Sequence, residues 1–281
     1  MRSGDKSDAQ FRGWTKPGPR VAGPIAVRAN ETLDAISGWY RILQLKAGHR
    51  FSTDDILTAW YGTAWCPRAD HVLDLGSGIG SVAMTAAWRL PGAQFVTVEA
   101  QAESVELAIR SAAYNELSER FDIRLGDFRE ASVLRPDEKF DLVMGSPPYF
   151  PLGSGVLGDH PQKVACRFEM RGDIRDYCSA AARQLGPGGW FVCIFPAEPA
   201  QEARVRRGIS QAGLVSVRRR PVILLEGEAP LLTLWAMTLA TDIPEWLRTS
   251  EWVEPPLIIR NKDGTIHPEY SAVKMSFGFP P

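Results

Sequence analysis

Short apolar runs alternate with helical segments along the middle of this chain. The apolar runs have the length of buried strands and lie at 71–76, 94–100, 121–127, 140–145 and 190–195. The segments with helical spacing lie at 79–90, 101–116, 173–185 and 198–213. Because strands that alternate with helices usually pair in parallel, this pattern predicts a doubly wound α/β sheet with helices on both faces.

Further elements are predicted on either side of this region. Residues 214–225 and 231–240 have the pattern of two more strands that pair antiparallel. The sheet is therefore expected to have seven strands, mostly parallel, with an antiparallel strand at its edge and a short N-terminal extension. Residues 40–51 predict a strand–turn–strand unit, and a polar side chain within 52–54 can cap the helix that follows.

Residues 1–30 differ from the rest of the chain. They are rich in Gly and Pro, and their six Lys and Arg residues outnumber two Asp residues. A segment of this composition is expected to be a disordered tail, and the alternative is a basic arm that contacts phosphates. Residues 31–281 are expected to form a single domain.

Composition and charge exclude several classes of protein. The 281 residues are 44% hydrophobic with a formal net charge of −1, which argues against binding nucleic acid by bulk charge. No apolar run approaches the ~18 residues that cross a membrane, and residues 1–20 lack the apolar stretch of a secretory signal. The four cysteines and four histidines show no spacing typical of a metal site. We expect a cytoplasmic protein with reduced thiols, no membrane segment and no bound metal.

Three glycines stand between the first predicted strand and its helix. Gly76, Gly78 and Gly80 allow a tight turn and the close approach of the backbone to a ligand. Glu99 ends the next predicted strand, where a ribose diol would lie. The spacing is G-x-G-x-G after Asp74, whereas dinucleotide sites prefer G-x-G-x-x-G. A tight turn without a ligand is the alternative, but the strand–glycine–helix context favours a cofactor site.

The strand at 140–145 ends on Ser146-Pro147-Pro148-Tyr149. Two prolines cannot donate backbone hydrogen bonds and fix their own φ angles, so one interpretation of the segment is a rigid exit from the strand without a chemical role. It also offers two acceptors, the Ser146 side chain and the Pro147 carbonyl, at the sheet edge where α/β folds bind ligands. Two acceptors against the N–H bonds of an exocyclic amine favour pyramidal nitrogen and methyl transfer to it. The Tyr149 ring can stack on a planar base.

The glycine loop resembles motif I of class I S-adenosylmethionine-dependent methyltransferases, which have a Rossmann-like sheet. The resemblance implies S-adenosylmethionine as cofactor, with its methionine part on the loop and its ribose on Glu99. Asp127 would meet the adenine amino group, and an N-cap role for this residue is compatible with that. The cofactor-binding residues implied in this way are Asp74, Gly76, Ser77, Gly78, Glu99, Asp127, Phe128 and Thr53.

The proline-containing segment resembles the (Asn/Asp/Ser)-Pro-Pro-(Tyr/Phe/Trp) signature of amino-group methyltransferases. This implies that Ser146, Pro147 and Tyr149 are catalytic and that Pro148 and Phe150 contact the substrate. Enzymes acting on adenine N6 or glutamine N5 mostly carry Asn at the first position, whereas Ser is familiar in cytosine-N4 enzymes. A protein glutamine, cytosine or a small-molecule amine are therefore alternatives to adenine.

Longer stretches within residues 38–275 resemble the bacterial tRNA (valine) adenine-N6 methyltransferase family. They include "SPPYFP", "HPQKVACRFE" and "PLIIRNKDGTIHPEYSAV". The resemblance implies methylation of adenine N6 in tRNA, with RNA as partner and residues 161–169 as a loop on the substrate side. Lys163 and Arg167 in that loop are candidate RNA contacts, with solvated surface charge as the alternative.

Two basic runs, at 204–207 and 218–220, are further candidates for RNA contacts. The remaining alternative is a non-catalytic RNA-binding module with the same fold. The oligomeric state is left open by the sequence.

Overall fold

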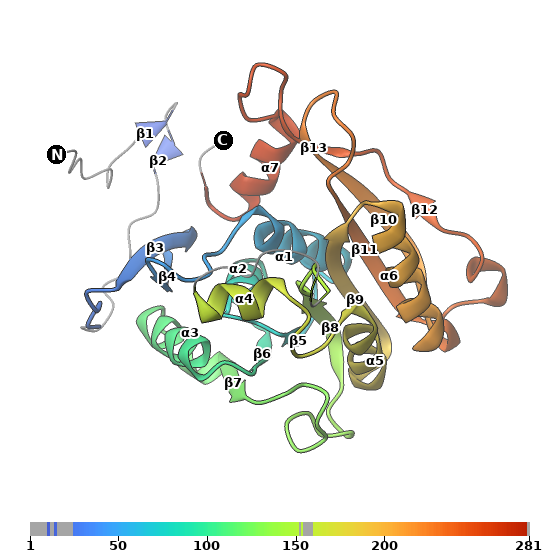
Figure 1. The fold of residues 1–281 in the computed structure, drawn as a ribbon, viewed down its shortest axis with the longest axis horizontal. Coiled ribbons are helices and arrows are strands. Elements are labelled where there is room, and N and C mark those ends of the chain that lie inside the picture. The colour runs from blue at the N-terminus through green and yellow to red at the C-terminus, as the bar shows by residue number, and fades with distance from the viewer. Residues whose placement is uncertain (1–9, 12–13, 16–24, 152, 154–159, 280–281) are drawn as a thin grey trace.

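The computed structural model describes residues 10–11, 14–15, 25–151, 153 and 160–279 (Figure 1). The large sheet consists of β5 (His71–Leu75), β6 (Gln94–Glu99), β7 (Phe121–Leu125), β8 (Phe140–Gly145), β9 (Leu185–Pro196), β10 (Leu214–Leu225), β11 (Leu232–Leu239), β12 (Trp252–Val253) and β13 (Leu257–Arg260). Two separate antiparallel two-stranded sheets are formed by β1 (Gln10–Phe11) with β2 (Trp14–Thr15) and by β3 (Glu31–Ser37) with β4 (Tyr40–Leu45). The α-helices are α1 (Thr53–Trp65), α2 (Ser81–Arg89), α3 (Ala102–Tyr114), α4 (Pro161–Arg167), α5 (Ile174–Gln184), α6 (Pro199–Gln211) and α7 (Pro268–Ser276). Within the described residues, no helix combines the length and apolar character needed to cross a bilayer.

The prediction of a doubly wound, mostly parallel sheet is confirmed. Its seven main strands have the order β10-β11-β9-β8-β5-β6-β7, and the short strands β12 and β13 pair in parallel with β10. The antiparallel strand is β11, which lies between β9 and β10 and not at the edge as predicted. The chain reaches β10 through the crossover helix α6, and the short connection from β10 allows β11 only an antiparallel return beside it.

Each face of the sheet is covered by helices because successive side chains of a strand point to opposite faces. Val72 of β5 and Leu142 of β8 belong to the core beneath α1 and α2. Their neighbours Leu73 and Val143 belong to the core beneath α5 and α6. The central strands β5 and β8 are buried on both faces, which explains why they are nearly continuous apolar runs in the sequence.

The N-terminal hairpin lies earlier in the chain than predicted. The predicted strand–turn–strand unit at 40–51 contains one strand only, β4, which pairs with the preceding β3. The turn is at Gly38, whose φ of +46° favours glycine. Beyond β4 the chain leaves the hairpin, and the side chain of Gln44 accepts a hydrogen bond from the backbone N–H of Phe51 at 2.8 Å. The predicted tail at 1–30 lies mostly outside the described residues.

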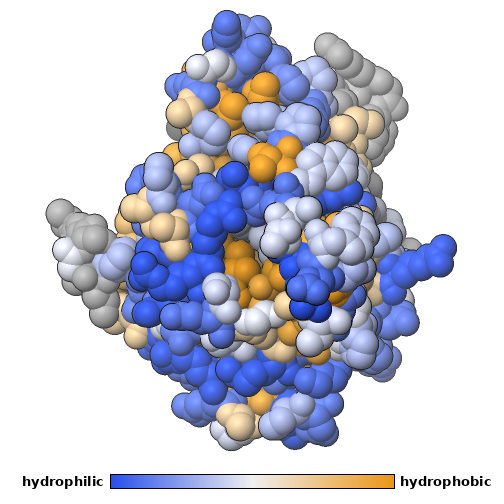
Figure 2. Space-filling view, turned by 90° about the vertical axis from the view of Figure 1, so that its right-hand side faces the viewer, coloured by the Kyte–Doolittle hydropathy of each residue, from blue (hydrophilic) through white to orange (hydrophobic). Residues whose placement is uncertain are grey.

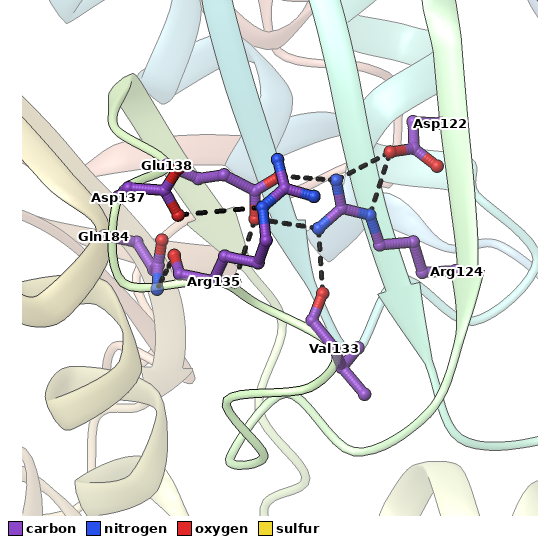
Figure 3. Close-up of polar contacts among 7 residues, drawn as sticks. All are labelled: Asp122, Arg124, Val133, Arg135, Asp137, Glu138 and Gln184. Atoms are coloured by element: carbon purple, nitrogen blue, oxygen red, sulfur yellow. Dashed lines mark hydrogen bonds and ion pairs between the residues drawn. The ribbon is translucent and has the colours of Figure 1, made fainter.

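An arginine–glutamate pair closes the long loop after β7 (Figure 3). Both terminal nitrogens of Arg124 donate to the carboxylate of Glu138, at 2.9 and 2.7 Å. The same guanidinium donates to the carbonyl of Val133 at 2.8 Å. Arg135 forms a second ion pair with Glu138 at 3.0 Å. These contacts tie the second half of the loop between β7 and β8 to Arg124 of β7.

We expect Glu138→Gln to lower the free energy of unfolding by about 1–3 kcal/mol at neutral pH, because it removes the less exposed acidic partner of the half-buried Arg124 and leaves the exposed Asp122. Arg124 lowers the pKa of Glu138, so this contribution is complete above the unfolded-state pKa of about 4.3 and is lost as the pH falls through the folded-state value. Urea denaturation at pH 7 and at lower pH measures both effects. The matched control is Asp137→Asn, an 80% exposed partner of Arg135, which should change stability by less than about 0.5 kcal/mol.

Candidate functional site

The register of three parallel strands brings the sequence motifs to one edge of the sheet. Leu75 at the end of β5 is paired with Val98 of β6 and with Gly145 of β8. The residues that follow these three are Gly76, Glu99 and Ser146. β5 and β8 are neighbours, but the chain continues from β5 to β6 in one direction along the sheet and from β8 to β9 in the other. Their carboxyl ends therefore form the topological switch point at which α/β sheets bind ligands.

The glycine loop has a left-handed backbone at each of its glycines. The φ angles of Gly76, Gly78 and Gly80 are +61°, +55° and +84°. Gly76 is closely packed, since a Cβ atom there would lie 2.1 Å from the hydroxyl of Tyr177. A Cβ atom on Gly78 would meet no atom within 4 Å, and Gly78 lines the pocket. The loop thus presents bare backbone to an open space.

Two buried polar atoms beside this loop have no hydrogen-bond partner within the described residues. They are Oδ1 of Asp74 and Oγ of Ser77. The other oxygen of Asp74 accepts a hydrogen bond from the N–H of Ala83 at 3.1 Å. Burial raises the pKa of Asp74 well above its usual value, so a cationic partner would favour its ionised form. This arrangement fits the amino-acid part of S-adenosylmethionine, which carries an ammonium group.

Glu99 is held in place by two backbone N–H groups. One carboxylate oxygen accepts from Gly78 at 3.0 Å, and the other accepts from Gln101 at 2.7 Å. Each carboxylate oxygen has a further lone pair with which it can accept from a ligand hydroxyl. Burial raises the pKa of Glu99. The side chain is therefore preorganised to accept hydrogen bonds from a diol.

Asp127 and Phe128 line the same pocket from the loop after β7. Asp127 accepts hydrogen bonds from the side chain of Arg129, at 2.9 Å to one oxygen and 2.5 Å to the other. This contact lowers the pKa of Asp127. Phe128 is buried, and its ring lies 4.7 Å from the ring of Tyr177 in an edge arrangement.

Part of the proline-containing segment lines the same pocket, whereas Tyr149 lies outside the lining. Ser146 and Pro148 line the pocket, and Pro147 between them is buried. Tyr149 is half-buried, and its hydroxyl donates to a carboxylate oxygen of Asp54 at 2.9 Å. Burial and the neighbouring Asp54 raise the pKa of Tyr149 well above its usual value, so the phenol stays protonated.

Several pocket residues were not predicted from the sequence. They are His49, Asp55, Cys166, Arg171 and Tyr177. Burial, with the nearby charge of Asp54, raises the pKa of Asp55 to about 7. Burial raises the pKa of Cys166 to about 12, so its thiol is not reactive. Two of these residues could have been suspected because they are close in sequence to predicted site residues. Asp55 is near Thr53, and Cys166 is near Lys163 and Arg167.

Other predicted residues lie outside the pocket lining. Thr53 is the first residue of α1, and its side chain faces Tyr270 of α7. Phe150 is 37% exposed, with the guanidinium of Arg167 5.6 Å from the centre of its ring. Lys163 and Arg167 are both exposed on α4. These last three residues lie near the pocket without lining it.

The segment 161–169 was predicted to be a loop, but its first seven residues form α4. Proline at the first helical position favours this start, because its missing N–H needs no partner there. Buried Gln162 fixes the helix to two other elements: its oxygen accepts from the N–H of His49 at 2.9 Å, and its nitrogen donates to Ser104 of α3 at 3.0 Å. In Figure 1, α4 lies across the strand ends that carry the site.

Most arginines of the basic runs at 204–207 and 218–220 contact other side chains of the protein. Arg206 and Arg219 share Glu251, at 2.9 and 2.8 Å. Arg218 lies between the rings of Trp65 and Trp252, 3.8 Å from each centre. The face that carries these elements mixes hydrophilic and apolar residues around a hollow (Figure 2). Because Arg206 and Arg219 are paired with Glu251, this surface is not uniformly basic.

Comparisons with known proteins agree with this geometry. A family profile described as the methyltransferase small domain matches residues 61–156. A tRNA1(Val) (adenine(37)-N6)-methyltransferase of Porphyromonas gingivalis is 29% identical over 82% of this chain and 89% of its own length. A release factor glutamine methyltransferase of Geobacter sulfurreducens is 36% identical over 45% of each chain. The crystal structure of a predicted O-methyltransferase from Agrobacterium tumefaciens superposes with a TM-score of 0.62 at 19% identity, covering 82% of this chain and 98% of that one.

The matched domain and the relatives identify the chain as an S-adenosylmethionine-dependent methyltransferase, and its doubly wound sheet agrees with the fold of the solved structure. Along most of its length the chain resembles the tRNA1(Val) (adenine(37)-N6)-methyltransferases, with 26% identity to a second such enzyme from Citrobacter koseri over 81% of this chain. The enzyme class and the cofactor predicted from the sequence are confirmed.

Proposed function

We propose that this methyltransferase transfers a methyl group to N6 of an adenine in tRNA. The proposal rests on one observation: Ser146 and Pro148 line the same pocket as the glycine loop. A motif that can hold an exocyclic amine thus lies beside a loop that can hold the methyl donor. The relatives similar along most of the chain are named for tRNA adenine-N6 methylation.

In this proposal the cofactor is held mainly by carboxylates and bare backbone. Asp74 and Ser77 accept hydrogen bonds from the amino-acid part, and Gly78 leaves room for it. Glu99 accepts from the ribose hydroxyls with its remaining lone pairs. The carboxylate of Asp127, which accepts four hydrogen bonds from Arg129, exchanges one of them for the adenine amino group, and Phe128 packs on the ring system. Bound in this way, S-adenosylmethionine supplies an activated methyl group.

The substrate amine is held by Ser146 and Pro147. The Ser146 hydroxyl oxygen and the Pro147 carbonyl each accept one of the two N–H groups, which turns the nitrogen lone pair toward the methyl donor. Tyr149 offers its ring for stacking, and its hydrogen bond to Asp54 limits rotation of that ring. Pro148 restricts the backbone between these groups.

The RNA backbone is proposed to bind beside α4. Lys163, Arg167 and Arg171 are exposed and form no ion pair with an acidic side chain in the described part of the chain. In contrast, Arg204 and Arg219 of the basic runs are paired with glutamates. Unpaired cations are available for phosphates, and Phe150 adds an exposed ring beside them. Modification of tRNA also implies action in the cytoplasm.

Deleting the gene should remove an N6-methyladenosine from the tRNA of the cell. Nucleoside mass spectrometry of purified tRNA, with and without the gene, measures this change, and a plasmid copy should restore it. Recombinant enzyme with S-adenosylmethionine should methylate tRNA from the deletion strain but not tRNA from the parent strain.

Unchanged N6-methyladenosine together with loss of N4-methylcytosine would replace adenine by cytosine as substrate. Unchanged nucleosides together with an unmethylated glutamine in a release factor would favour the second candidate. That candidate is supported by the 36% identity to a release factor glutamine methyltransferase over 135 residues.

A further inference from the structure

The hydroxyl of Ser146 has one hydrogen-bond contact within the described residues. That contact is the hydroxyl of Thr58 on α1, at an Oγ–Oγ1 distance of 3.5 Å. Thr58 is fully buried, whereas Ser146 is half-buried and lines the pocket. Ser146 therefore lies between a buried hydroxyl on one side and the pocket on the other.

The direction of this contact follows from a second hydrogen bond. The Thr58 hydroxyl also contacts the backbone carbonyl of Asp54 at 2.8 Å. A carbonyl oxygen can only accept, so Thr58 donates its single hydrogen to Asp54. Thr58 then has only lone pairs left for Ser146, and Ser146 has to be the donor in the contact between the two hydroxyls.

We propose that Thr58 is a positioning residue that fixes the Ser146 hydroxyl as a hydrogen-bond acceptor toward the substrate amine. With its hydrogen directed at Thr58, Ser146 has both lone pairs free, and one can face the pocket. The inference rests on the proposed methyl transfer to an exocyclic amine, because only there is an acceptor required at this position.

The contact with Thr58 makes the serine hydroxyl a hydrogen-bond acceptor toward the pocket, as the oxygen of an amide or carboxylate is by itself. A side-chain carbonyl always accepts, but a hydroxyl rotates and can present either its hydrogen or its lone pairs. A hydrogen directed into the pocket would oppose the N–H groups of the amine. Thr58 removes that orientation, so that serine performs the function of the more common Asn or Asp.

The same turn of α1 holds both polar groups of the proline-containing segment. The backbone carbonyl of Asp54 accepts from Thr58, and the carboxylate of Asp54 accepts from Tyr149 at 2.9 Å. The position of Thr58 one turn after Asp54 is what allows the first of these bonds in a helix.

The variants Thr58→Val and Thr58→Ser test the proposal. Valine has the shape of threonine without its hydroxyl, so kcat should fall about tenfold, the value of one hydrogen bond of about 1.4 kcal/mol, while KM for S-adenosylmethionine stays unchanged. Serine keeps the hydroxyl and should retain most of the wild-type kcat. Equal loss in both variants, or no loss with valine, would overturn the assignment.

A double-mutant cycle separates positioning from general damage. In the Ser146→Ala background the acceptor is already missing, so Thr58→Val should cause no additional loss of rate. A merely structural Thr58 would lower the rate by the same factor in both backgrounds, and that result would contradict the proposal. Thermal denaturation of each variant shows whether it is folded.

Neutron diffraction from deuterium-exchanged crystals locates the hydrogen of the Ser146 hydroxyl directly and needs no substrate. The Ser146 deuteron should lie between Ser146 and Thr58, and a deuteron directed into the pocket would overturn the inference. If the wild-type enzyme instead methylates no tRNA, the proposed substrate is wrong while the diffraction result still establishes the direction of the hydroxyl.

Discussion

Replacing Ser146 by alanine should lower kcat for methyl transfer about 100-fold, because one of two acceptors for the substrate amine is lost. Replacing Tyr149 by alanine should lower kcat/KM about tenfold or more, because base stacking contributes roughly 1–3 kcal/mol. Among the described residues, the side chains of Ser146 and Tyr149 hydrogen-bond to α1 and not to the carboxylates of Asp74 and Glu99, so S-adenosylmethionine should bind both variants with near-wild-type affinity. Initial rates on tRNA and calorimetric titration with the cofactor measure the two effects separately.

The matched control is Tyr149→Phe, which keeps the ring and loses only the hydrogen bond to Asp54. It should retain considerably more activity than Tyr149→Ala, since stacking is preserved. Full turnover by Ser146→Ala and Tyr149→Ala would show that the active site has been assigned to the wrong segment. A parallel loss of cofactor binding in both would show that they support the pocket as a whole.

Alanine substitutions in the glycine loop should separate folding from cofactor binding. At Gly76 the added Cβ atom would lie 2.1 Å from the buried Tyr177 hydroxyl at a φ of +61°, so Gly76→Ala should lower the free energy of unfolding by about 2–4 kcal/mol. At Gly78 the φ is +55° but the Cβ atom has open space. Gly78→Ala should therefore destabilise the fold by only about 1 kcal/mol, yet weaken cofactor binding about tenfold or more by filling the pocket.

Urea denaturation and calorimetric titration of the two variants provide the comparison. Gly92→Ala is the control, because its Cβ atom also meets nothing within 4 Å and it lies away from the pocket lining. Equal destabilisation at Gly76 and Gly78 would mean that backbone strain, and not the contact with Tyr177, determines stability. Unchanged cofactor affinity of Gly78→Ala would remove Gly78 from the cofactor site.

Features that depend on neighbouring residues in the chain could be predicted. The strands could be recognised because a strand buried on both faces has to be apolar along its whole length. The glycine loop and the Ser-Pro-Pro-Tyr segment were visible because Gly and Pro have conformational properties that no other residue replaces. Their combination was sufficient to predict the class of enzyme and its cofactor.

Features that depend on contacts between distant segments could not be predicted in the same way. The antiparallel strand was placed at the edge of the sheet, because the sequence does not contain the pairing of β11 with both β9 and β10. Asp55 and Cys166 reach the pocket only because α1 and α4 pack against the strand ends. Residues 161–167 form a helix that Gln162 holds through partners 58 and 113 positions away.

The sequence by itself determined the chemical groups of this protein: a bare glycine loop, an acid at the end of the next strand, and a serine with two prolines and a tyrosine. Only the tertiary structure decided their relative positions, because the register that pairs Leu75 with Val98 and Gly145 is set by packing on both faces of the sheet. It also decided what Ser146 can do. A hydroxyl can donate or accept, and the buried Thr58, 88 positions earlier in the chain, leaves its lone pairs to the pocket.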